Sequence, residues 1–128
     1  MIRTIILALA FALFANSAKA KKPNVIILVA DQLRYQSVGF TDDRAITPNI
    51  DKLGYNGLRF TQMYNGARCC PSRAALLTGL HPHQAGIGQL SADLGVRSYQ
   101  GYLREDCVTI AEVLQTSGYR TMISGKWH

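Results

Sequence analysis

The sequence ARCCPSRAALLTG, residues 67–79, decides the fold of this chain. Pro71 suits the first turn of a helix, where its missing N–H costs nothing, and Gly79 is a typical stop signal. The stretch therefore predicts a short apolar helix with Cys69 at its N-terminus. Free backbone N–H groups and the helix dipole favour an anion at that end. With Arg73 one turn further on, the arrangement suits a tetrahedral oxyanion such as sulfate or phosphate.

A continuous apolar and β-branched run, NVIILVA, occupies residues 24–30. Such a run is typical of a strand that is buried on both faces of a parallel sheet. Asp31 and Gln32 follow at its carboxyl end, which is where open α/β sheets place their ligands. A carboxylate there suits a hard cation such as Ca²⁺ or Mg²⁺, although an N-capping or turn aspartate fits equally well. Residues 33–46 are rich in turn residues and predict a loop.

Two further helices are predicted from their end signals. Thr47 followed by Pro48 is typical of an N-cap and a first helical position, and this helix should end near Gly57. Residues 109–112, TIAE, form a capping box, and the helix that they begin should stop at Gly118. The side chains expected to face inward are Ile50, Leu53 and Tyr55 on the first of these helices and Ile110, Val113 and Leu114 on the second.

The remaining segments complete an α/β order. Residues 58–64 and 119–124 predict a second and a third strand, and the glycine-rich residues 81–102 predict a long surface connection able to carry substrate contacts. Strand, helix, strand, helix, loop, helix and strand in succession indicate an α/β fold. Because the chain stops directly after a strand, we expect an incomplete fold that is poorly folded and inactive by itself.

The first twenty residues predict a signal peptide. Arg3 supplies a charged start, residues 5–15 are apolar, and residues 18–20 read AKA, an A-x-A cleavage site. The apolar run is shorter than the roughly 20 residues that span a bilayer. We therefore expect an exported protein, periplasmic or secreted, without stable membrane insertion; an uncleaved anchor is the alternative. Without residues 1–20 the chain has twelve basic and eight acidic residues, spread without basic runs, so we expect no nucleic-acid partner.

The CxPSR motif that begins at Cys69, continuing AALLTG, resembles the signature of the sulfatase family. The strand ending at Asp31 and the GKWH segment, residues 125–128, match the same family. The resemblance covers essentially all of residues 22–128, and we interpret residues 21–128 as a truncated, N-terminal part of the sulfatase catalytic domain. It implies an alkaline-phosphatase-like α/β sandwich, with a mixed, mostly parallel sheet and helices on both faces.

The resemblance also implies roles for these positions. A maturation enzyme would oxidise Cys69 to formylglycine, whose hydrated aldehyde is the nucleophile toward a sulfate ester. Arg73 would hold the formylglycine hydroxyl, and Lys126 would contact the sulfate. His128 would partner the hydroxyl whose deprotonation releases sulfate. We expect Lys126 and His128 on one side of an extended segment, with Trp127 opposite.

A divalent cation is a further implication of the resemblance. Asp31, Gln32 and the modified Cys69 would bind Ca²⁺, or alternatively Mg²⁺, together with ligands that lie downstream in the family. Sulfatases commonly have a second aspartate where Gln32 stands. An amide oxygen still binds a cation but carries no charge, so the affinity and the identity of the metal depend on this departure.

Two smaller features stay open or are set aside. Conversion of Cys69 would leave Cys70 and Cys107, which could form a disulfide or remain two buried free thiols. His81 and His83 suggest a metal pair, but a polar loop after a helix accounts for them, and they are not included among the ligands.

The expected function is sulfate ester hydrolysis by an exported, arylsulfatase-like enzyme. One alternative keeps the fold and the nucleophile but changes the bond, as in phosphonate monoester and phosphodiester hydrolases. Another is a non-catalytic exported binding relative. The joint presence of Cys69, Arg73, Lys126 and His128 argues against that relative, whereas Gln32 slightly favours it.

Overall fold

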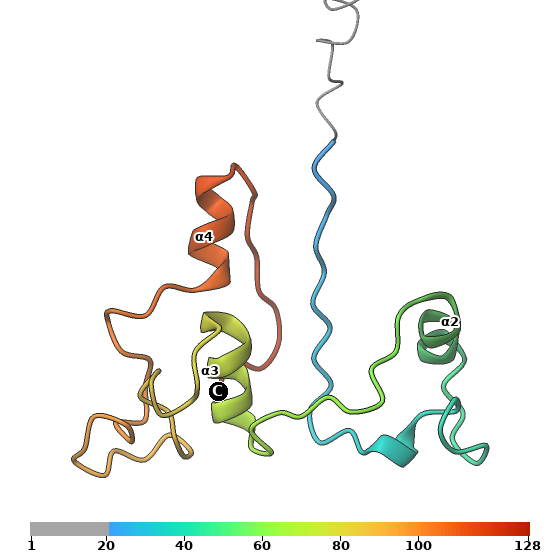
Figure 1. Ribbon diagram of the computed structural model, residues 1–128, viewed down its shortest axis with the longest axis horizontal. Helices are drawn as coiled ribbons and strands as arrows, with labels where there is room; N and C mark the ends of the chain where they lie inside the picture. The colour runs from blue at the N-terminus through green and yellow to red at the C-terminus, as the bar shows by residue number, and fades with distance from the viewer. Residues whose placement is uncertain (1–20) are drawn as a thin grey trace, which may run out of the picture. The chain divides into compact units, whose positions relative to one another are not determined.

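The computed structural model describes residues 21–128, and the expected signal peptide lies outside the described residues. The chain divides after Ala30 into two units, which we treat separately. The second unit carries a 3₁₀ turn and three α-helices (Figure 1). In chain order they are η1 (Tyr35–Ser37), α2 (Pro48–Asn56), α3 (Cys69–Thr78) and α4 (Ile110–Thr116).

Helix α3 forms where the sequence predicts it. It begins at Cys69, has Pro71 in its first turn, and ends at Gly79, whose φ of 70° is left-handed. The Gly79 N–H donates to the Ala75 carbonyl at 2.8 Å, which closes the last turn. A non-glycine residue would be strained in this conformation, so the glycine is what allows the helix to stop here.

The start signals of α2 and α4 are also confirmed, with one difference. In α4 the Thr109 hydroxyl accepts from the Glu112 N–H, and the Glu112 carboxylate accepts from the Thr109 N–H at 2.7 Å. In α2 Pro48 occupies the first turn, but the Thr47 hydroxyl does not cap the helix. It accepts from the Gly39 N–H at 2.7 Å and so ties the preceding loop to the helix.

The inward faces predicted for α2 and α4 are largely wrong. Helix α2 has no buried residue, and Leu53 is 65% exposed. On α4 Val113 is exposed, and Leu114 is half-buried. The amphipathic spacing is present in the sequence, but the described residues supply no layer that covers these faces.

The three predicted strands are not formed as strands in the described part of the chain. Residues 24–30 are extended (Figure 1) and exposed throughout, and residues 58–64 and 119–124 do not form strands either. A strand is stabilised by hydrogen bonds to a neighbouring strand, and none of the three has such a neighbour here. The sheet of the expected sandwich is therefore absent from residues 21–128.

The core lies partly in the segment that the sequence predicts as a surface connection. Cys70 and Ala74 of α3 pack with Ala85 and Ile87, and Ala85 is fully buried. An isolated antiparallel bridge between Ile87 and Tyr99 closes the segment on itself. The prediction for residues 81–102 is thus wrong in part, because small apolar residues among the glycines let the loop pack closely against α3.

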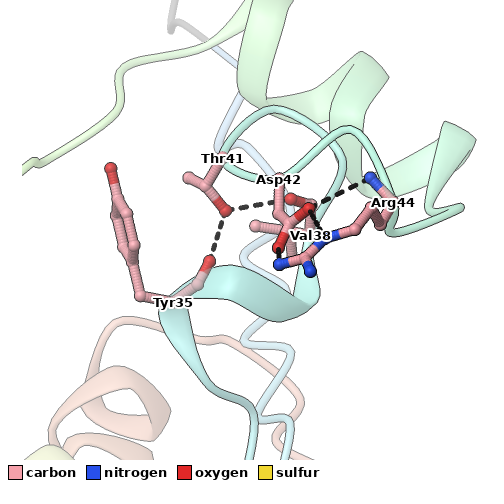
Figure 2. A network of polar contacts seen from close by, with 5 residues as sticks. All are labelled: Tyr35, Val38, Thr41, Asp42 and Arg44. Carbon is pink, nitrogen blue, oxygen red and sulfur yellow. Dashed lines mark hydrogen bonds and ion pairs between the residues drawn. The ribbon is translucent and has the colours of Figure 1, made fainter.

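A second local structure surrounds η1, where the sequence predicts only a loop. Figure 2 shows the Thr41 hydroxyl donating to the carbonyls of Tyr35 and Val38, the latter at 2.9 Å. The Asp42 carboxylate accepts from the Arg44 guanidinium at 2.7 and 2.9 Å. Side-chain to backbone bonds of this kind order a turn without regular secondary structure.

Helices α3 and α4 contact each other.

Among residues 21–128 no helix has the length and apolar character required to cross a membrane.

We predict that Thr109→Ala lowers the free energy of unfolding by about 1 kcal/mol, because it removes the hydroxyl that caps α4. Urea unfolding of the complete protein measures the change. The matched control is Thr116→Ala, whose hydroxyl donates within the same helix to the Val113 carbonyl at 2.7 Å, and which we expect to be nearly neutral. Equal losses in the two variants would contradict the assigned cap.

Candidate active site

Three segments that lie far apart in the sequence meet at the N-terminal end of α3. The first contributes Asp31, the second Cys69 and Arg73, and the third Lys126. Asp31 is 42 residues from Arg73 and 95 residues from Lys126. Cys69 and Arg73 share one face of α3 because they are four residues apart on a helix.

The Asp31 carboxylate is the centre of this cluster. Its Oδ2 accepts from Lys126 Nζ at 2.9 Å, and its Oδ1 accepts from Arg73 Nη2 at 3.4 Å. Arg73 also donates from Nη1 to the Lys126 carbonyl at 2.9 Å, so the guanidinium fixes both the carboxylate and the backbone of the third segment. The Arg73 side chain is only 15% exposed.

Hydrogen bonding and charge shift the pKa values of both partners in opposite directions. The hydrogen bond from Lys126, followed by those from Cys69 and Arg73, lowers the pKa of Asp31 below 3.8. The hydrogen bond to Asp31 raises the pKa of Lys126 above 10.5, and Cys69 adds to the effect. Both ion pairs are therefore lost as the pH falls through the lowered pKa of Asp31, and the pair with Lys126 is also lost as the pH rises through the raised pKa of Lys126.

Arg73 and His128 also border a cavity of about 220 Å³. Most of its wall is apolar and includes Leu77, Tyr102 and Trp127. The expected alternation of the third segment is therefore wrong: Trp127 and His128 border the same cavity, while Lys126 turns to Asp31.

Non-glycine residues with positive φ occur beside each of the three segments. They are Gln32 (56°), Ala67 (53°) and His128 (71°). Such conformations cost of order 1–3 kcal/mol and tend to occur at functional sites. No signal in the sequence predicts those of Gln32 and Ala67, because Gln and Ala carry no preference for the left-handed region.

The donor set offers one ligand for a divalent cation and not a complete site. Ca²⁺ takes six to eight oxygen ligands, as a rule several carboxylates. Among the described residues no group of three His, Cys, Asp or Glu side chains could hold a metal ion. Asp31 supplies an ionised carboxylate and Gln32 an uncharged amide, and both residues are exposed.

All three cysteines are free thiols. Cys70 is 2% exposed and belongs to the hydrophobic core beside α3. Cys107 packs against this core and is half-buried. The sequence left open a disulfide between Cys70 and Cys107 or two free thiols, and in the structure both are free thiols.

We predict that Asp31→Asn lowers the pKa of Lys126, because the substitution removes the negative charge that stabilises its ammonium. An NMR titration of the Lys126 side chain in lysine-labelled complete protein measures the shift. Asp42→Asn is the control, since Asp42 pairs with Arg44. An unchanged Lys126 pKa in Asp31→Asn would show that the pair does not form in solution.

Comparison with known proteins agrees with the sequence resemblance. The Sulfatase family model matches residues 23–128. Bovine arylsulfatase A is 45% identical over 124 residues, which cover 94% of this chain and 24% of the bovine protein. Human steryl-sulfatase is 39% identical over 127 residues, or 95% of this chain and 22% of its own length.

An uncharacterised sulfatase of Schizosaccharomyces pombe is 37% identical over 123 residues, covering 90% of this chain and 22% of the yeast protein. The chain thus spans about a quarter of the length of the relatives it matches. Since the family model matches far more than half of the chain, the protein belongs to the sulfatase family.

Proposed function

We propose that the complete protein hydrolyses sulfate esters at the N-terminal end of α3, with residue 69 in its formylglycine form as the nucleophile. The observation that carries the proposal is the position of Cys69 at the first residue of α3, beside Arg73 and Lys126. The free backbone N–H groups at the start of α3 favour an anion. The two cationic side chains also outnumber the single carboxylate, so the site favours a tetrahedral anion. Membership of the sulfatase family supports sulfate over other oxyanions.

Arg73 is suited to orient the anion because it is already fixed on two sides. Its Nη atoms are engaged by Asp31 and the Lys126 carbonyl, while its Nε is buried and has no hydrogen-bond partner among the described residues. An unsatisfied buried donor is costly. A bound sulfate oxygen or the hydroxyl of residue 69 would satisfy it.

The formylglycine hydrate would supply two hydroxyls on one carbon. One would attack sulfur and displace the alcohol, which leaves a sulfate ester on residue 69, and deprotonation of the other would expel sulfate and restore the aldehyde. Lys126, whose contacts include both Asp31 and Cys69, would hold an oxygen next to residue 69. We assign His128 the proton transfer that releases sulfate, since imidazole titrates near neutrality and His128 borders the same cavity as Arg73.

For the metal, we propose that Asp31, Gln32 and the modified residue 69 provide ligands from this part of the chain and that the rest come from outside it. When bound, Ca²⁺ or Mg²⁺ would neutralise charge on the sulfate oxygens. Asp31 would then share its carboxylate between the cation and Lys126. We further propose that the protein is exported and that a maturation enzyme converts Cys69 before it can act.

The fold that we propose for the complete protein is the alkaline-phosphatase-like sandwich. Residues 24–30, 58–64 and 119–124 would be strands of its sheet. The support is the family membership together with the exposed apolar side chains of these segments, among them Ile26 at 79% exposure. A sheet would remove that surface from water.

We predict that Arg73→Ala lowers kcat/KM for an aryl sulfate by about 10²–10³-fold, the usual cost of removing one preorganised donor. Steady-state kinetics of the complete protein test this. Arg44→Ala is the matched control because Arg44 is exposed and pairs with Asp42 away from α3, so its kinetics should match the parent. Equal activity in Arg73→Ala and Arg44→Ala would refute the assigned site.

The reaction class is tested by assaying an aryl sulfate and an aryl phosphonate diester in parallel. We expect the sulfate to be preferred and Cys69→Ala to abolish its hydrolysis. A preference for the phosphonate diester would indicate a phosphonate monoester or phosphodiester hydrolase. If neither substrate is hydrolysed, the result would favour a non-catalytic binding relative.

A further inference from the structure

His81 and His83 form a pair on the loop after α3, outside the candidate active site. Their Nδ1 atoms lie 3.2 Å apart, and their rings are nearly parallel with centroids 5.0 Å apart. On the opposite edge of the His83 ring, Nε2 lies 2.9 Å from the Tyr99 hydroxyl. The cluster is thus a chain of three side chains in contact.

The His83 ring is held in place by its surroundings. A Cβ on Gly88 would lie 2.5 Å from His83 Cδ2, so the ring packs directly on the glycine backbone. The Tyr99 ring meets it edge-on at 5.1 Å. The Gly88 N–H donates to the Ser98 carbonyl at 2.9 Å, and this bond holds the segment with Gly88 beside the segment with Tyr99.

The turn that carries both histidines is also ordered by hydrogen bonds. The His81 carbonyl accepts from the N–H groups of Gln84 and Ala85 at 2.8 and 3.1 Å. The Gln84 side chain accepts from the His81 N–H at 3.0 Å, and Pro82 between the histidines is buried. The imidazole of His81 is exposed, so it can rotate while its backbone stays fixed.

We propose that His81 and His83 bind a divalent transition-metal ion through their Nδ1 atoms, with Tyr99 as the outer hydrogen-bond partner. Imidazole nitrogens lie about 2.0–2.1 Å from Zn²⁺, so two of them at a tetrahedral angle are about 3.3 Å apart. The observed separation is 3.2 Å. A ligating histidine usually donates its other ring N–H. In the tautomer in which His83 Nε2 donates to the Tyr99 hydroxyl, the His83 Nδ1 lone pair faces His81 Nδ1, and a bound metal would replace the proton between the two Nδ1 atoms.

This site differs in kind from the calcium site proposed above. Its donors are imidazoles, which suit Ni²⁺, Cu²⁺ and Zn²⁺, whereas Ca²⁺ prefers oxygen ligands. Since the described residues contain no group of three metal-binding side chains, water would fill the remaining positions. We therefore expect an exchangeable surface site, independent of the proposed hydrolysis.

Calorimetric titration of the untagged complete protein with Ni²⁺ at pH 8, in excess Ca²⁺, tests the proposal. Ni²⁺ is chosen because thiolates favour softer metals. We expect His81→Ala, at an exposed position, to bind one equivalent fewer than the parent. Tyr99→Phe should keep the equivalent with about 10–100-fold weaker affinity.

Tyr102→Phe is the matched control, since Tyr102 borders the active-site cavity, and its Ni²⁺ affinity should equal that of the parent. An unchanged number of equivalents in His81→Ala would overturn the site and leave the pair as a hydrogen bond only. An unchanged affinity in Tyr99→Phe would overturn the role of the tyrosine. Because binding is the readout, neither result depends on sulfatase activity.

Discussion

The contacts of one carboxylate, that of Asp31, hold the candidate site together. Lys126 and Arg73 are both cationic and would repel each other, yet each bonds to a different oxygen of the same carboxylate. Exposed ion pairs are individually weak. Here Arg73 makes a second bond, to the backbone carbonyl of Lys126, so the guanidinium contacts both the carboxylate and the segment that carries the second cation.

This network of contacts surrounds residue 69, the position that we propose as the nucleophile. Cys69 is fixed by the start of α3, and Arg73 by its place one turn later. Asp31 can reach both the Cys69 thiol and the two cations. An anion that approaches residue 69 therefore meets two cations that are already oriented, and little reorganisation is needed on binding.

The elements with local signals are the ones that the sequence predicts well. The ends of α3 and the capping box of α4 depend on residues within one or two turns, such as Pro71, Gly79 and Thr109. The strands depend on partners far along the chain, and no pattern within residues 24–30 supplies them. The core inside residues 81–102 is missed because Ala85 and Ile87 carry no periodicity.

The site follows the same division. The spacing of Cys69 and Arg73 predicts their common face, whereas the arrival of Asp31 and Lys126 is expected only from the resemblance to sulfatases. The contact of Tyr99 with His83 has no local signal, because it depends on where the loop after α3 folds back.

The central claim of this account is that residue 69 acts as an aldehyde hydrate and not as a thiol. The mass of the peptide containing residue 69, from the complete and active protein purified from its own host, tests the claim most directly. We predict a form lighter than cysteine by one sulfur and two hydrogens and heavier by one oxygen. Unmodified cysteine in a preparation that hydrolyses sulfate esters at full rate would contradict the account.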